Sequence, residues 1–355
     1  MDNLQINETP VRTSKNFGIN NIKLDNINMP KNFAYFSNVD INIESTKDKV
    51  TSNNKQIEGL TYGLGEELEN QIKEKCNCSL KIDVSSILNK EILINFGFNE
   101  SNRNLAENVE INASEKTKST VIITYKSDDD TNYYHNGIIR VLANKNSEVN
   151  VIVVNFMGSR ATNFLSIENE VEDNAKLSFT IVDFGGKVSI SNYFTNVVGK
   201  EAKTELNTIY LGKGNQIFDL NYIDELRGEK SDAKIEVQGA LNDSARKNFK
   251  GTIDFKKGCK KAVGSENEAC MLLSDKAKSI ALPMLLCSEE DVEGEHSTSS
   301  GKIGDKELFY IMSRGFELKE ARKLLVRAKF NWIIEKIKKD ELKEEIINEI
   351  DKRLD

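Results

Sequence analysis

Short runs of alternating apolar and polar residues fill the middle of the chain. From Leu80 onward, segments such as LKIDV, EILINFGF and VEINA change polarity at every residue, as strands with one buried face do. Between Ser119 and Leu273 the sequence has no segment of useful length with helical spacing. We therefore predict that the centre of the chain is built from strands.

A longer period is superimposed on these strands. Each repeat of this longer period contains two or three strand-like runs, among them FLSIENEV, VSISNYF and QIFDLNYI. This pattern is typical of a β-solenoid, in which each coil covers the apolar face of the next. The alternative is an antiparallel sandwich, which would carry turn signals roughly every 8 to 12 residues without the longer period. A small or polar residue followed by a strand-like run recurs in steps of 28, 27, 27 and 31 residues, from Ser119, Ser147, Asn174, Glu201 and Asp232.

The N-terminal part of the chain has a different amino-acid composition. Residues 1 to about 60 are polar and rich in Asn, with few apolar anchors, and this composition predicts a loosely packed arm. Residues 66–75 contain helix-forming residues with a short apolar stripe, so they predict one surface helix.

After Gly301 the apolar residues take up helical spacing. We predict a helix over residues 305–314, capped by Asp305 and ended by Gly315, and two more over residues 317–337 and from Asp340 onward. Such stripes form core or partner surfaces. The apolar stripe of the second helix comprises Ala321, Leu324, Leu325, Ala328, Trp332 and Ile333, and that of the third comprises Leu342, Ile346, Ile347, Ile350 and Leu354.

Composition and charge narrow the possible functions. The 355 residues carry a net charge of −7 without a long basic run, which disfavours a nucleic-acid partner. Because no apolar run reaches about 18 residues, we expect no membrane span. The first residues lack the pattern of a signal peptide, so we expect a cytoplasmic protein, whose five cysteines stay unpaired.

Most catalytic and metal-binding motifs are missing from the sequence. The Walker A, HExxH, GxSxG and GxGxxG patterns do not occur, so any ATP would be used by a partner. Cys76 and Cys78 lack the spacing and companions of a zinc site. Asp128–Asp130 lack the spacing of a calcium loop and are interpreted as a solvated loop, and His135 as a packed or exposed histidine.

Residues 268–315 join the strand region to the helical region. They contain two cysteines, the proline of the C-terminal half and His296, one of two histidines. Met271–Leu273 and Ile280–Leu286 predict strands, with a turn at residues 274–276. His296 then falls in a segment rich in Gly, Ser and Thr, which predicts a loop.

Five ordered motifs show a family resemblance. They are RKNFKGTIDFKKGCKKAVGSEN (residues 246–267), CMLLSDKA (270–277), DVEGEHSTSSGKI (291–303), LFYIMSRG (308–315) and EARKLL (320–325). In this order and spacing the chain resembles the SufB/SufD family of iron–sulfur cluster assembly scaffold proteins, and specifically a SufD-like subunit. The resemblance is specific from residue 246 to 325 and extends in kind over residues 119–337.

The resemblance implies a mainly β fold with a right-handed parallel β-helix core. Residues 1–79 would form a polar arm and helical cap, residues 80–300 the β-helix, and residues 301–355 a helical domain. It implies a non-catalytic scaffold that pairs with SufB and docks the SufC ATPase to support assembly and transfer of nascent clusters. The residues expected at the SufC contact are Leu308, Phe309, Arg314, Gly315, Leu324 and Leu325.

For the site, the resemblance implies that His296 is a ligand of a transient iron–sulfur cluster, shared with the partner where the β-helix meets a sister chain. Glu268, Cys270 and Cys287 are weaker candidates, and we interpret Glu268 as a surface residue. Glu268 and Ser297 stand where SufB has its cysteine and glutamate, and Gly294 stands where SufD usually has a cysteine, so the chain lacks the sulfur-accepting thiol of SufB.

Three alternatives remain open at this point. The first is a SufB-like or homodimeric scaffold of the same system. The second is a β-helix enzyme acting on carbohydrate, and the third is a structural scaffold in which no residue contacts iron. The low aromatic content of 7% and the lack of a signal peptide count against the enzyme.

Overall fold

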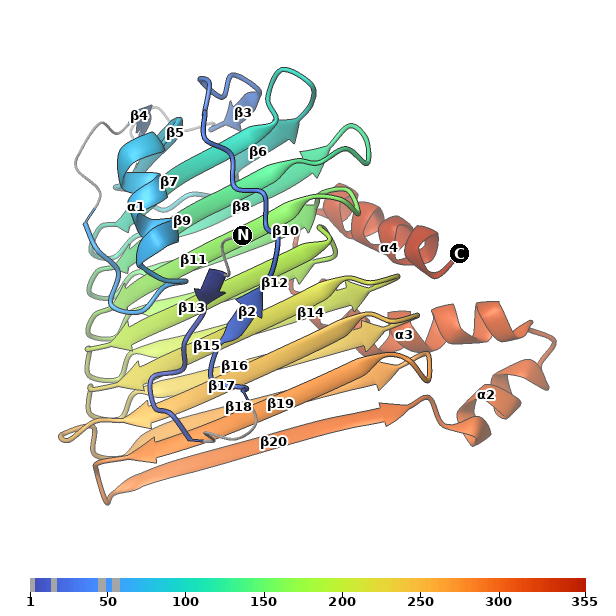
Figure 1. Cartoon of the computed structure of the whole chain (residues 1–355). Coiled ribbons are helices and arrows are strands. Elements are labelled where there is room, and N and C mark those ends of the chain that lie inside the picture. The colour runs from blue at the N-terminus through green and yellow to red at the C-terminus, as the bar shows by residue number, and fades with distance from the viewer. Residues whose placement is uncertain (1–3, 14–17, 44–48, 53–57) are drawn as a thin grey trace.

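The computed structural model describes residues 4–13, 18–43, 49–52 and 58–355. Within them the chain forms a parallel β-solenoid with two long sheets that face each other (Figure 1). From β5 to β20 successive strands alternate between the sheets, so each coil supplies one strand to each sheet. The mainly β class and the solenoid predicted from the repeat are therefore confirmed.

Each sheet has nine strands in the described part of the chain. Sheet I consists of β20 (Val292–Lys302), β18 (Ala262–Leu272), β16 (Asp232–Leu241), β14 (Lys203–Gly212), β12 (Lys176–Asp183), β10 (Glu148–Phe156), β8 (Lys118–Ser127), β6 (Ile92–Phe98) and β3 (Val39–Asn42). Sheet II consists of β19 (Lys278–Cys287), β17 (Arg246–Phe255), β15 (Ile217–Leu226), β13 (Val188–Val197), β11 (Thr162–Val171), β9 (Tyr134–Ala143), β7 (Asn104–Ala113), β5 (Cys78–Val84) and β4 (Lys49–Ser52). Within these two sheets the described strands are parallel except at the N-terminal end, where β3 pairs antiparallel with β6 and β4 pairs antiparallel with β5.

The turns from sheet II to sheet I explain the sequence repeat. In six of them a residue with φ between 56° and 61° precedes a small buried residue. The backbone N–H of the small residue donates a hydrogen bond to the carbonyl three residues earlier, which closes the turn. The pairs are Lys116–Thr117, Asn146–Ser147, Asn174–Ala175, Glu201–Ala202, Lys230–Ser231 and Lys261–Ala262.

Consecutive turns stack closely on one another. The Asn146 N–H donates to the carbonyl of Asp173 in the next turn at 3.0 Å, and the Asn174 N–H donates to that of Lys200 at 2.9 Å. A Cβ atom on Gly228 would lie 1.7 Å from the carbonyl oxygen of Gly199, so this contact requires glycine. The repeat thus records the small residues that fit inside the corner of each coil.

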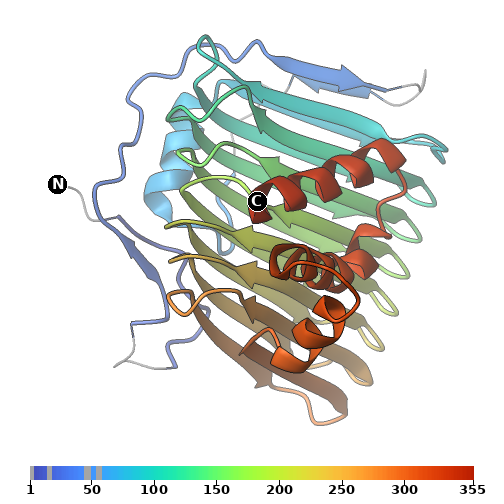
Figure 2. The same ribbon diagram turned by 90° about the vertical axis from the view of Figure 1, so that its right-hand side faces the viewer.

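Other elements cover part of the outer face of each sheet (Figure 2). α3 (Leu318–Ile334) and α4 (Asp340–Leu354) pack on sheet I. On sheet II lie the hairpin of β1 (Leu4–Ile6) and β2 (Ile22–Leu24), together with α1 (Glu66–Lys75). None of the helices in the described part of the chain is long and apolar enough to cross a membrane.

The C-terminal helices agree with the sequence prediction in number but differ in detail. α2 (Asp305–Met312) begins after Gly304, and no side chain caps it, so the prediction that Asp305 is the cap was wrong. Asp305 instead lies in the first turn, where its charge favours the helix dipole. Gly315 has φ 95° and follows the helix end, as predicted.

The apolar stripe predicted for α3 was only partly right. Leu324 and Trp332 are exposed, with 36% and 38% of their surface accessible. The face that packs on sheet I is turned relative to the predicted stripe. It consists of Val326, Phe330, Ile333 and Ile334.

Candidate functional site

The C-terminal end of the solenoid is open. β19 and β20 are the edge strands of their sheets, and each pairs with a single strand within the described part of the chain (Figure 1). Every residue of β20 except the half-buried Val292 is exposed. A long edge of this kind offers unpaired backbone groups to another chain. His296 lies in this strand, so the predicted loop was wrong: the main chain pairs with β18 although GEHSTSSG shows no apolar alternation.

The side chains inside the solenoid change from apolar to polar near this end. The residue column that starts with Ile92 continues in register on successive strands of sheet I and ends at Glu266 and His296. A neighbouring column ends with Val237, Glu268 and Thr298. The last two coils therefore replace an apolar core with ionisable and hydroxyl side chains. The members of the first column before Glu266 are Ile92, Val121, Val151, Phe179, Leu206 and Ile235.

Glu268 forms a buried ion pair with Lys247 of β17. The Lys247 Nζ donates to Glu268 Oε1 at 2.7 Å, and both side chains are inaccessible to solvent. The Tyr210 hydroxyl donates to the same oxygen at 3.1 Å. Its ring crosses the space left by Gly239, where a Cβ would lie 1.8 Å from the ring. The interpretation of Glu268 as a surface residue was therefore wrong, because a lysine from the opposite sheet compensates its charge inside the solenoid.

Glu266 is buried beside this pair without a partner of its own. Neither carboxylate oxygen of Glu266 has a hydrogen-bond partner among the described residues, and the carboxyl occupies the space above Gly251, where a Cβ would lie 2.4 Å from it. Burial, reinforced by the charge of Glu268, raises the pKa of Glu266 to about 8. This carboxyl is therefore neutral near pH 7, and it lies one strand below His296.

The two candidate cysteines lie in different environments. Cys270 is buried on the same face of β18 as Glu268, and burial raises the pKa of its thiol. Cys287 is exposed at the last residue of β19, and its thiol lies 2.9 Å from the carbonyl of Glu289. All five cysteines are free, as predicted.

The structure brings some of the candidate ligands together and leaves others apart. Glu268 and Cys270 share one face of β18, and His296 lies one strand further out on the same side of sheet I. Within the described residues, no group of three or more His, Cys, Asp or Glu side chains is placed to hold a metal ion. Of the candidate ligands on these two strands, His296 is exposed, whereas Glu268 and Cys270 are buried.

α2 presents the second candidate surface. It has no buried residue, and the ribbon leaves the solenoid here (Figure 1). Of the residues expected at a partner contact, Phe309 is 74% exposed, Arg314 and Gly315 are exposed, and Leu308 is half-buried. Tyr310, Met312, Phe316 and Leu318 extend this exposed apolar surface. Contiguous exposed apolar residues of this kind are a candidate interaction surface.

Sequence reasoning missed the residues that line the interior of this end. Lys247, Tyr210 and Glu266 were not singled out, since a charged residue in an alternating run is normally assigned to the solvent face. One signal was available: Lys247 precedes Phe249 by two residues, which places both on the same face of the strand. The same holds for Glu266, Glu268 and the buried Cys270.

Comparison with known proteins gives a family match over most of the solenoid. The model of the family described as "SUF system FeS cluster assembly, SufBD core domain" matches residues 96–329. Its boundaries include the open end, α2 and part of α3.

Several relatives carry names from the same system. The chain is 25% identical over 220 residues to the iron–sulfur cluster assembly protein SufD of Bacillus subtilis, covering 62% of this chain and 50% of that protein. It is 33% identical over 161 residues to the SufBD family protein PH1385 of Pyrococcus horikoshii, covering 44% and 35%. It is 21% identical over 245 residues to SufD of Escherichia coli, covering 69% and 58%. The match thus spans between about a third and three fifths of these relatives.

Proposed function

Because the chain belongs to the SufBD family of iron–sulfur cluster assembly proteins, we propose that it is a SufD-like, non-catalytic scaffold subunit acting in the cytoplasm. In this role it pairs with a SufB-type subunit through the open end of its solenoid and docks a SufC-type ATPase on its C-terminal helices. The nascent iron–sulfur cluster is cargo held between the subunits.

The observation that carries this proposal is the open end formed by β19 and β20. A parallel edge strand of eleven residues exposes its backbone hydrogen-bonding groups, and a second solenoid placed end to end would satisfy them. The polar side chains at this end, including His296 and Thr298, would then lie within the interface. Their burial by a partner is consistent with the replacement of apolar core residues in the last two coils.

His296 is the residue we propose as a cluster ligand. A neutral imidazole binds iron, and this one is exposed at the edge of the solenoid. Since Glu268 is neutralised by Lys247 and the thiol pKa of Cys270 is raised by burial, neither is placed to donate to a metal in the isolated chain. Cys287 is exposed and remains a weaker candidate.

The surface around Phe309 is the contact we propose for the ATPase. It combines exposed aromatic residues with Arg314, whose guanidinium lies over the Tyr310 ring at 5.2 Å. Aromatic residues and arginine are enriched where partners bind most tightly. No nucleotide-binding loop occurs in the sequence, so ATP hydrolysis is assigned to that partner.

Co-purification tests this function. The chain is co-expressed under anaerobic conditions with a SufB-type and a SufC-type protein, and the complex is weighed by native mass spectrometry. We expect one copy of this chain with a SufB-type subunit and the ATPase. Phe309→Ala should release the ATPase, whereas the control Ile87→Ala, which changes an apolar residue 65% exposed elsewhere on the solenoid, should not.

Two other outcomes would change the assignment. Recovery of a complex that contains two copies of this chain without a SufB-type subunit would support the homodimeric scaffold. Purification of the chain alone from such cells would contradict the proposal. The family match favours both scaffold arrangements over a carbohydrate-active enzyme.

A further inference from the structure

A separate pocket lies between the N-terminal arm and the outer face of sheet II. It has a volume of about 810 Å³, within the range of roughly 300 to 1,000 Å³ found for small-molecule sites. Residues 22–28 and Pro30 form one wall, and the first residues of strands β9, β11, β13, β15, β17 and β19 form the floor. This pocket is on the outside of the solenoid and is distinct from the interior of the open end.

The lining of this pocket is cationic although the whole chain carries a net charge of −7. Five exposed cations line it, and Asp25 is the one carboxylate among its lining residues. A sixth lining cation, Lys247, is already paired with Glu268 inside the solenoid. None of the five forms an ion pair with another residue in the described part of the chain. They are Lys23, Arg160, Lys187, Arg246 and Lys278.

Two of these cations are direct neighbours. Arg246 and Lys278 are register partners in the parallel strands β17 and β19, which places their backbones roughly 5 Å apart. Like charges in this position are destabilising. A bound anion would remove that cost.

The opposite sheet contains a comparable pair of lysines. Lys176 and Lys203 are also register partners at the start of neighbouring strands. There the surrounding ladder contains carboxylates: Glu148 pairs with Lys118 at 2.7 Å, and Glu205 pairs with Lys336 at 2.7 Å. Carboxylates thus lie within this ladder on sheet I, whereas the strand starts that line the pocket on sheet II carry none.

The pocket also has an apolar side. Ile22 and Leu24 of β2 face Tyr134, Val188 and Ile217 on the sheet, and all five belong to or pack against one apolar cluster. Asn132 and Asn248 add amide groups to the lining. A ligand that matches this lining has a multiply charged anionic group and an apolar part.

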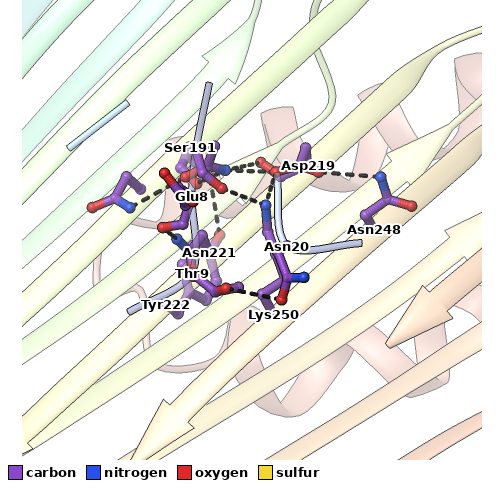
Figure 3. A network of polar contacts seen from close by, with 11 residues as sticks. Glu8, Thr9, Asn20, Ser191, Asp219, Asn221, Tyr222, Asn248 and Lys250 are labelled. Carbon is purple, nitrogen blue, oxygen red and sulfur yellow. Dashed lines mark hydrogen bonds and ion pairs between the residues drawn. The ribbon is translucent and has the colours of Figure 1, made fainter. Parts of the chain in front are cut away.

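The wall of the pocket is fixed before any ligand binds, because the hairpin is anchored by a buried polar network (Figure 3). The side-chain amide of Asn7 donates to Asp219 Oδ1 at 2.6 Å and to the Ser191 carbonyl at 3.1 Å. Lys250 Nζ donates to the Asn7 carbonyl at 2.7 Å and to Asp219 Oδ1 at 2.5 Å. The side-chain amide of Asn221 donates a hydrogen bond to the carbonyl of Glu8 at 2.9 Å. A pocket with a fixed wall loses less entropy on binding.

We propose that this pocket binds a small organic phosphate or pyrophosphate ester. Its anionic group lies among Arg246, Lys278 and Lys187, and its apolar part lies against Val188 and Ile217. Arginine and lysine provide charge-assisted hydrogen bonds to phosphate oxygens. The argument for this binding does not rest on the scaffold function proposed above, although Lys278 is the first residue of the edge strand β19.

Isothermal titration of the full chain with inorganic pyrophosphate tests this inference. We expect saturable binding that weakens as salt is added, and a loss of at least about tenfold in affinity in the double variant Arg246→Gln/Lys278→Gln. The matched control Lys176→Gln/Lys203→Gln removes two register-paired lysines from sheet I and should bind as the original chain does.

The same titration with malonate at equal ionic strength tests the phosphate assignment. Malonate should bind at least about tenfold more weakly, because its two carboxylates offer fewer acceptor oxygens than pyrophosphate. Equal affinity for the two anions would overturn the phosphate assignment. An absence of pyrophosphate binding, or equal weakening in both double variants, would overturn the site. Thermal unfolding of each variant is expected at or above the midpoint of the original chain, because a like-charge pair is removed, and shows that a lost signal is not lost folding.

Discussion

His296 on β20 lies directly opposite Glu266 on β18 in the parallel register of sheet I. The six residues that precede them in the same column are all apolar. An exposed imidazole is thus placed one strand beyond a buried neutral carboxyl, at the point where the apolar core ends. This is the arrangement expected of a solenoid end that another protein covers.

The buried carboxyl of Glu266 gives the isolated chain a characteristic pH dependence. Burial raises its pKa from 4.5 to about 8, so the folded state holds the proton more tightly than the unfolded state does. The resulting stability is fully present below about pH 4.5 and is lost as the pH rises toward about 8. Urea unfolding across this range should show that Glu266→Gln, which stays neutral, loses less stability than the original chain. Equal pH slopes would contradict the burial of this carboxyl.

Removal of one partner of the buried pair between Lys247 and Glu268 should destabilise the fold strongly. Lys247→Met leaves a carboxylate uncompensated inside the solenoid and should cost roughly 3–5 kcal/mol in the free energy of unfolding. The double variant Lys247→Met/Glu268→Gln should recover most of that loss, as denaturant unfolding can measure. A small effect of the single variant would show that the pair is accessible to water.

The architecture was predictable because it repeats, and the site was less so because it lies where the repeat ends. Each coil needs a small residue such as Ala175 or Ala202 inside its corner, so the period appears in the sequence. β20 has no alternation to reveal a strand, since both of its faces are exposed in this chain. Its prediction as a loop followed directly from that exposure.

The burial of Glu268 was hidden for a different reason. Its partner Lys247 is 21 residues away and belongs to the other sheet, and only the packing of two coils brings the charges together. The face of α3 was likewise set by the sheet it covers. A helix pattern gives the spacing of apolar residues but not which of two overlapping stripes, one with Phe330 and one with Trp332, lies against the protein.

The anchor of the N-terminal arm should depend on the side chain of Asn7. Asn7 has φ 59°, a conformation that glycine adopts easily, so Asn7→Gly removes the hydrogen bonds without strain. We expect a loss of roughly 1–3 kcal/mol and faster hydrogen exchange in residues 4–8. The control Asn26→Gly has the same conformation, with φ 58°, and lies outside the network. Unchanged exchange in Asn7→Gly would show that the network does not hold the arm.

The packing of α3 on sheet I can be tested with two aromatic residues two positions apart. Phe330 is fully buried, and its ring lies 6.5 Å from that of Phe184. Phe330→Ala should therefore cost roughly 3–5 kcal/mol. Trp332→Ala, at a position 38% exposed, should change stability by less than about 1 kcal/mol. A larger loss in the second variant would mean that the helix is rotated about its axis.

The iron and acid-labile sulfide content of the anaerobically assembled complex, together with its visible absorption, tests the proposed role of His296 most directly. His296→Ala should lower the cluster content well below that of the original complex while the subunits still co-purify. The control Glu295→Ala changes the neighbouring exposed residue, which points to the other side of β20, and should leave the cluster content unchanged. Equal cluster content in His296→Ala and the original complex would contradict the assignment of this histidine as a ligand.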